Sequence, residues 1–350
     1  MARRGRFGDA AERLRELLPG DWTLSLTDPS DRRADIRLTT PTGMAIDIEV
    51  KALKDASPRA VGALIRSGSP TLVVADWISP RSRDLLRASR TSYLDATGNA
   101  EIRLDEPTVY IRIDGADRNP APGPTTGPRL RGPKAWAVLR TMAEVPPPFG
   151  VRELAEAVDV DPGYVSRVLR ALEDDLLVTR TPRGPVTGVE WEGVLRKAAV
   201  TYSLFDANET STWVATSGPD RLVDDLGSKR AGDWAVTGSV AASRLAPVTG
   251  AEVAIIYTSD ADSLARAGRL LPATRGANVV LAIPYDPVVF EATVDSGVVR
   301  YVSTAQVALD SLTGNARMPA EGEAILGWMR KNEPRWRTRT LKPRHKTRSA

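Results

Sequence analysis

The chain has 350 residues, no cysteine and one histidine, His345, which lies in a Lys/Arg-rich tail. These counts exclude disulfides, thiolate zinc sites, cysteine nucleophiles and histidine-based triads, so any catalysis would rest on carboxylates, Lys, Ser or Tyr. The length predicts two or three domains, and the net charge of +4 divides into +8 for residues 330–350 and −4 for the rest of the chain.

The first expected domain, residues 1–114, alternates helices and strands. Apolar periodicity predicts helices near residues 8–18, 58–66 and 81–89, and apolar runs predict strands at 22–26, 34–40, 44–52, 71–78 and in a final pair around YLDATGNAEIRL and TVYIRI. These elements fit one small α/β domain. The next stretch, GADRNPAPGPTTGPRLRGP (115–133), is dense in Pro and Gly and predicts a linker.

The stretch ADIRLTTPTGMAIDIEVK (34–51) places charged residues on two neighbouring predicted strands. Side chains alternate between the faces of a strand, so Asp47, Glu49 and Lys51 share a face, and Asp35 opens the preceding strand. Two carboxylates could hold a divalent cation that activates water, while a lysine stabilises charge. The alternative is a strand with a charged, solvated face that serves as scaffold or contacts DNA, and we favour this alternative.

The element order and this charge pattern also resemble the restriction-endonuclease-like fold. The motif of that fold is an Asp followed by (Asp/Glu)-x-Lys, and the matching positions are Asp35, Glu49 and Lys51. The resemblance implies that these three residues are the candidate catalytic residues of a Mg²⁺-dependent nuclease of the PD-(D/E)xK type.

Residues 134–192 carry the most informative pattern in the chain. KAWAVLRTMAEV predicts a supporting helix, and VRELAEAV predicts a short helix with one apolar face. Asp161 suits an N-cap and Pro162 the first position of the next helix, which would bury Val165, Val168, Leu169 and Leu172. LLVTRTPRGPVTGVEW then predicts two strands around a Pro-Arg-Gly-Pro tip. This order predicts a winged helix-turn-helix, and it resembles the MarR/IclR-like winged helices of bacterial regulators.

A helix-turn-helix places its second helix in the major groove of DNA, and a wing reaches phosphates or the minor groove. Polar side chains on the free face of the second helix and arginines near the wing tip are therefore the expected DNA-binding residues. They are Tyr164, Ser166, Arg167, Arg170, Arg180 and Arg183. The alternative is a winged helix that serves protein contacts or dimerisation.

Residues 193–329 are expected to form a second α/β domain, with strands in DWAVTG, AEVAIIYT, ANVVLAIPY and VVRYVS and helices in TAQVALDSLT and AEGEAILGWMRK. TSYLDATGNAEI, WAVTGSVAASRLAP, GANVVLAIPYDPVVF and VSTAQVALDSLTGNARMPAEGEAIL resemble the AbiEi-like proteins, winged-helix transcriptional regulators that include antitoxins of type IV toxin–antitoxin pairs. The resemblance implies a repressor, or an antitoxin that neutralises a toxin. In that family the winged helix usually stands at the N-terminus, whereas here about 130 residues precede it.

Residues 330–350 carry nine basic side chains against Glu333 alone and predict a disordered basic tail. Such a tail either adds non-specific affinity for phosphates or serves only solubility. No apolar stretch is long enough to span a bilayer, and MARRGRFGDAAERLRELL predicts an amphipathic helix rather than a signal peptide. We therefore expect a cytoplasmic, nucleoid-associated protein.

The sequence thus predicts a mixed α/β (α+β), multidomain chain that acts as a sequence-specific DNA-binding transcriptional regulator, and specifically as a repressor. Its expected partners are double-stranded DNA, a second copy in a homodimer, and either a toxin or a small-molecule effector. We expect no membrane association, no cofactor, no bound metal and no enzymatic activity.

Overall fold

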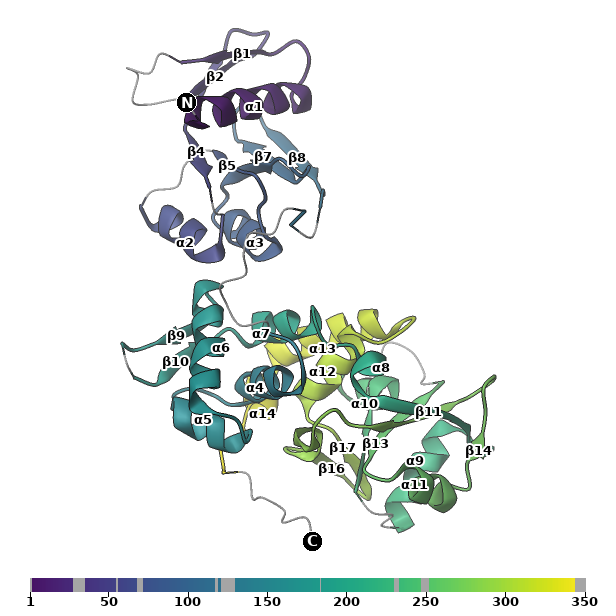
Figure 1. Cartoon of the computed structure of the whole chain (residues 1–350). Coiled ribbons are helices and arrows are strands. Elements are labelled where there is room, and N and C mark those ends of the chain that lie inside the picture. Colours follow the sequence, from purple (N-terminus) through teal and green to yellow (C-terminus); the bar gives the residue numbers. More distant parts are fainter. Residues whose placement is uncertain are drawn as a thin grey trace. The chain divides into compact units, whose positions relative to one another are not determined.

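The computed structural model describes residues 2–27, 35–54, 56–67, 72–116, 119–120, 130–182, 184–229, 233–246 and 252–343. The chain divides into two compact units (Figure 1), the first made of Met1–Thr126 with Glu173–Leu176 and the second of Gly127–Leu172 with Leu177–Ala350. No helix in the described part is long and apolar enough to cross a membrane. Helices and several sheets occur together, so the predicted mixed α/β class is confirmed.

Within its described residues, the first unit contains two sheets and three helices. Its helices are α1 (Ala2–Leu17), α2 (Pro58–Ser67) and α3 (Pro80–Ala88), and its strands are β1 (Thr23–Leu26), β2 (Ile36–Thr39), β3 (Ala45–Ile48), β4 (Val50–Leu53), β5 (Leu72–Ala75), β6 (Ser92–Asp95), β7 (Ala100–Leu104) and β8 (Val109–Ile113). Strands β1, β2 and β3 form an antiparallel sheet. Strands β4 to β8 form the second sheet in chain order, parallel from β4 to β6 and antiparallel from β6 to β8.

Strand β5 shows why the second sheet is covered on both faces. Leu72 and Val74 belong to the apolar cluster that contains Leu14 of α1, whereas Val73 belongs to the cluster that contains Leu86 of α3. Side chains alternate between the faces of a strand, so a run that is apolar at every position requires cover on both sides. The continuous run that predicted a strand at 71–78 is therefore a buried central strand.

The predicted single strand at 44–52 is two strands. Strand β3 ends at Ile48 and pairs with β2, while β4 begins at Val50 and pairs with β5, so Glu49 lies between two sheets. Most of the predicted linker, 115–133, lies outside the described residues.

The second unit joins the winged helix to a seven-stranded sheet. Its helices are α4 (Pro133–Glu144), α5 (Val151–Ala157), α6 (Pro162–Asp174), α7 (Trp191–Ala199), α8 (Leu204–Ala207), α9 (Pro219–Lys229), α10 (Gly238–Leu245), α11 (Ala261–Gly268), η1 (Pro287–Phe290), α12 (Thr304–Leu312), α13 (Met318–Lys331) and α14 (Glu333–Trp336). Its strands are β9 (Val178–Arg180), β10 (Val186–Val189), β11 (Glu209–Val214), β12 (Trp234–Thr237), β13 (Ala254–Thr258), β14 (Leu271–Pro272), β15 (Val279–Ile283), β16 (Val294–Ser296) and β17 (Val299–Tyr301). The large sheet has the order β14-β11-β15-β13-β12-β17-β16. Helices α10, α12 and α13 pack together, and α9 packs with α11 (Figure 1).

A buried carboxylate ties helix α12 to this sheet. The side chain of Asp310 is completely buried and accepts hydrogen bonds from Tyr202, Thr237, Tyr257 and Gln306 at 2.6–3.1 Å. Burial raises the pKa of Asp310 to about 6, although these donors oppose the shift. The donors come from the sheet, from α12 and from the loop after α7, so the hydrogen bonds of Asp310 hold these three parts of the unit together.

The winged helix belongs to the same compact unit as residues 193–343. One apolar cluster runs through both parts, because α4 and α7 pack against α12. Trp136 of α4 also makes edge contacts with Tyr202 and Tyr285, with ring centroids 5.3 and 5.5 Å apart. The supporting helix α4 is therefore packed against the C-terminal part of the chain as well as against the helix-turn-helix.

The prediction of a disordered tail is wrong for residues 330–343. Helix α14 continues the chain after α13, and Trp336 is buried with its ring 4.9 Å from that of Trp191. Arg330 forms an ion pair with Glu192 at 2.6 Å, and Arg337 pairs with Glu333 at 2.7 Å. The basic side chains that suggested disorder are thus partly neutralised by carboxylates of the folded unit. Residues 344–350 lie outside the described residues.

Candidate nucleic-acid interface

The helix-turn-helix is formed by α5, a tight turn and α6. Asp159 in the turn has a positive φ of 50°, and the backbone N–H of Val160 donates to the carbonyl of Ala155. The side chain of Asp161 accepts a hydrogen bond from the N–H of Tyr164 at 3.0 Å, as an N-cap does, and Pro162 begins the helix. The predicted core positions of α6 are buried: Val165, Val168, Leu169 and Leu172.

The opposite face of α6 carries the predicted DNA-binding side chains. Arg167 and Arg170 are exposed and lie three residues apart, so they occupy the same side of the helix. Tyr164 and Ser166 are partly buried, and the guanidinium of Arg167 lies 5.9 Å from the ring centre of Tyr164. Burial raises the pKa of Tyr164, while Arg167 opposes the shift, so the tyrosine remains a neutral hydroxyl donor at neutral pH. Four of the predicted residues therefore come together on one helix.

The wing is a two-stranded antiparallel hairpin. Strands β9 and β10 pair with an irregularity between Val186 and Gly188, and Val186 also bridges to Phe149 before α5. This bridge attaches the hairpin to the loop that leads into the helix-turn-helix. Arg180 ends β9 and is partly buried, whereas Arg183 at the tip lies outside the described residues. The DNA-binding roles of Arg180 and Arg183 both stay predictions.

The winged helix as a whole is not basic. Residues 133–192 carry a net charge of −3, so overall attraction cannot supply DNA affinity here. The charges are nonetheless divided along α6, since Arg167 and Arg170 precede Glu173 and Asp174 at the far end. Recognition helices contact bases mainly through their N-terminal residues. The distribution therefore directs DNA contact to the part of α6 that precedes Glu173.

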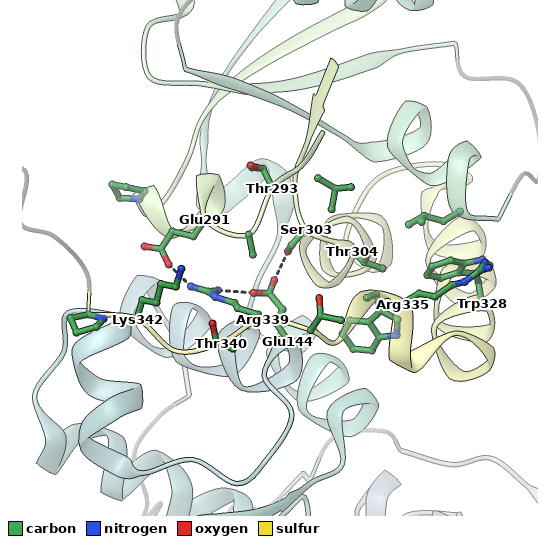
Figure 2. Close-up of a pocket in the computed structure, with 17 residues that line it drawn as sticks. Glu144, Glu291, Thr293, Ser303, Thr304, Trp328, Arg335, Arg339, Thr340 and Lys342 are labelled. Atoms are coloured by element: carbon green, nitrogen blue, oxygen red, sulfur yellow. Dashed lines mark hydrogen bonds and ion pairs between the residues drawn. The ribbon is translucent and has the colours of Figure 1, made fainter. Parts of the chain in front are cut away.

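A buried ion-pair network fixes the end of α4, the supporting helix (Figure 2). Arg140 is fully buried and donates from Nε to Glu144 at 2.7 Å, and its other nitrogens donate to the carbonyls of Val288 and Glu291. Glu144 also accepts from Ser303 and, at 2.6 Å, from Arg339 (Figure 2). Burial alone would raise the pKa of Glu144, but the charges of Arg140 and Arg339 outweigh it and hold that pKa below its ordinary value.

A C-terminal strap, residues 337–343, completes this network. Arg337 donates from Nε to the carbonyl of Ala143 at 3.1 Å and from Nη2 to that of Val145 at 3.3 Å. These carbonyls belong to the end of α4, where helix carbonyls lack internal partners. The sequence interpretation missed this role because it grouped these arginines with the tail. The tryptophan beside them, Trp336, was the available signal, because a large apolar side chain is unusual in a disordered segment.

The nuclease-type residues of the first unit lie near the junction of β3 and β4. The carboxylate of Asp35 accepts a hydrogen bond from the N–H of Val50 at 2.8 Å, and Lys51 Nζ lies 2.6 Å from Glu49 Oε1. Asp47 is instead paired with Arg37 across β2 and β3, at 2.6 and 2.9 Å. Glu49 and Lys51 therefore pair with each other on either side of Val50, and Asp35 binds the backbone of Val50. Among the described residues, no group of three or more His, Asp or Glu side chains is arranged to hold a metal.

Comparison with known proteins identifies the central segment. No curated protein and no solved structure matches the chain. These results leave the AbiEi-like resemblance of the C-terminal region as a prediction. Residues 133–183, which comprise α4, α5, α6, β9 and the start of the wing tip, match the family model of the MarR family. The segment that the geometry describes as a winged helix is thus similar to a family of DNA-binding winged-helix regulators.

Proposed function

We propose that this protein is a sequence-specific DNA-binding transcriptional regulator that acts as a repressor. The observation that carries the proposal is the exposed pair Arg167 and Arg170 on α6, in a segment that is similar to the MarR family. Arginines on a recognition helix can donate two hydrogen bonds to the O6 and N7 atoms of guanine. Binding of such a protein over a promoter would exclude other proteins from that DNA, and it would place the regulator at the nucleoid in the cytoplasm.

We further propose that the protein acts as a homodimer. One winged helix reads only a half-site, and two-fold symmetric dimers match the symmetry of palindromic operators. The overall negative charge of the winged helix makes the avidity of two half-sites more important, since non-specific attraction is weak.

The test is selection of DNA from a random duplex pool with the purified full-length chain, followed by competition at fixed salt. We expect one palindromic sequence to bind at least roughly a thousandfold more tightly than unrelated duplex, as specific regulators do. Equal affinity for all duplexes would contradict sequence-specific regulation and would leave the winged helix as a protein-contact module.

A metal-dependent nuclease is the second candidate, and it is favoured by the hydrogen bond between Asp35 and the backbone of Val50 beside the Glu49–Lys51 pair. Two carboxylates suit Mg²⁺, which prefers oxygen ligands and retains several waters. Asp35 and Glu49 would hold the ion, which would supply activated water for phosphodiester hydrolysis. Lys51 would release Glu49 and stabilise charge on the phosphate. In this candidate the winged helix delivers the first unit to its DNA.

Replacement of Lys51 by alanine tests the nuclease candidate. If the site cuts, Mg²⁺-dependent nicking of supercoiled plasmid should fall roughly a hundredfold, because a preorganised charge at the reacting phosphate is lost. Lys54→Ala is the matched control, since Lys54 is an exposed lysine just beyond β4. Absence of nicking by the unaltered chain with Mg²⁺ or Mn²⁺, or equal nicking by Lys51→Ala, rejects the candidate.

A further inference from the structure

A cavity of about 850 Å³ lies in the second unit beside the end of α4. Its walls come from α4, from the segment that follows η1, from the start of α12, from α13 and from the C-terminal residues 335–343. This volume is within the range of pockets that bind small organic molecules, roughly 300–1,000 Å³. None of the residues that line the cavity belongs to α6 or to the first unit.

The charges that line the cavity are unbalanced. Two carboxylates, Glu144 and Glu291, both bind Arg339. Two further cations, Arg335 and Lys342, line the cavity, and neither forms an ion pair within the described part of the chain. Anions are therefore favoured over cations as ligands.

The lining groups are arranged by kind along the cavity. Figure 2 shows Lys342, Arg339 and Thr340 toward one end, and Trp328 with Arg335 toward the other. Lysine, arginine and threonine side chains all donate hydrogen bonds, so the first end suits phosphate oxygens. The partly buried indole of Trp328 offers a flat surface on which a base can stack. A ligand that fits both ends has phosphates at one end and an aromatic base at the other.

We propose that this cavity binds a nucleoside diphosphate, with its phosphates at Lys342 and Arg339 and its base against Trp328. Glu291 is the more exposed of the two carboxylates on Arg339, with 29% of its side chain accessible against 2% for Glu144. The phosphates displace Glu291 from Arg339, while Glu144 keeps its bonds to Arg140 and Ser303.

The position of the cavity couples the ligand to the winged helix. The strap that carries Arg339 and Lys342 also carries Arg337, whose guanidinium binds the carbonyls at the end of α4. The chain enters the helix-turn-helix at Val151, a few residues beyond these carbonyls. A ligand that shifts the strap therefore changes the support of α5 and α6. This regulatory step rests on the proposed DNA binding, whereas binding of the nucleotide does not.

Nucleotide binding is tested first without DNA, by calorimetric titration of the full-length chain with ADP, GDP, CDP and UDP, and with adenosine and pyrophosphate. We expect at least one diphosphate to bind, pyrophosphate to bind more weakly, and adenosine not to bind measurably. Lys342→Ala should weaken the diphosphate at least about tenfold, through loss of a charge-assisted contact. Lys331→Ala is the matched control, since Lys331 is exposed at the end of α13 and does not line the cavity.

Two results would overturn the nucleotide site. One is that no diphosphate binds at about 1 mM, a concentration that corresponds to only ~4 kcal/mol of binding free energy. The other is that Lys342→Ala binds the diphosphate as tightly as the unaltered chain does.

The coupling is tested next, by measuring operator affinity with and without the saturating nucleotide. A change of several-fold supports the coupling, and unchanged affinity overturns the coupling while the site stands. Failure to find any operator would count against the proposed function alone, because nucleotide binding is measured independently.

Discussion

Arg167→Ala is expected to lower affinity for the operator roughly 10- to 100-fold, the cost of losing a bidentate contact to a base. Arg167 is exposed on the N-terminal half of α6, and it is not one of the buried residues through which this helix packs against the core. The substitution should therefore leave folding unchanged and affinity for unrelated duplex nearly unchanged. Competition binding with operator and unrelated DNA at two salt concentrations measures both effects.

Two arginine variants provide controls for this result. Arg221→Ala removes an exposed arginine of α9, outside the winged helix, and should leave operator affinity as it is. Arg183→Ala, at the predicted wing tip, should weaken binding to all sequences alike and reduce the salt slope by about 1, as loss of a phosphate contact does. If Arg167→Ala binds the operator as tightly as the unaltered chain, α6 is not the recognition helix.

Glu144→Gln is expected to lower the free energy of unfolding of the second unit by about 3 kcal/mol, because it leaves the buried Arg140 without the carboxylate that it pairs with. Arg140 has no exposed surface, and after the substitution its guanidinium would keep only its hydrogen bonds to the backbone carbonyls of Val288 and Glu291. Arg339 would lose one of its two carboxylates as well. Urea denaturation at neutral pH, followed by tryptophan fluorescence, measures the loss.

The matched control is Glu323→Gln. Glu323 pairs with Arg196 at 2.7 Å, but 53% of its side chain is exposed, so the expected loss is below about 1 kcal/mol. The contrast separates the effect of burial from the effect of removing any ion pair. A loss for Glu144→Gln as small as that for Glu323→Gln would show that the network does not hold the strap to α4.

Local patterns determined the elements of the winged helix. The apolar spacing of α6, the cap at Asp161 and the Pro-Arg-Gly-Pro tip act over a few residues, so they could be interpreted without the rest of the fold. The same holds for the buried strand β5. By contrast, β11 was not predicted, because its polar positions, such as the half-buried Ser211 and the exposed Thr212, show no clear alternation of apolar and polar residues in the sequence. Its strand conformation depends on hydrogen bonding to β15.

The sequence by itself determined that residues 134–192 form a winged helix and that Arg167 and Arg170 share its free face, because helical periodicity determines which side chains lie together. Only the tertiary structure decided what supports that winged helix. Arg140, Glu144 and Arg339 are 4 and 195 residues apart along the chain, yet they form one buried network. No local pattern specifies such pairing, since charged side chains are usually solvated unless the fold brings partners to them. Residues 337–343, which were expected to be part of a disordered tail, therefore form a strap that binds the end of α4 in the winged helix.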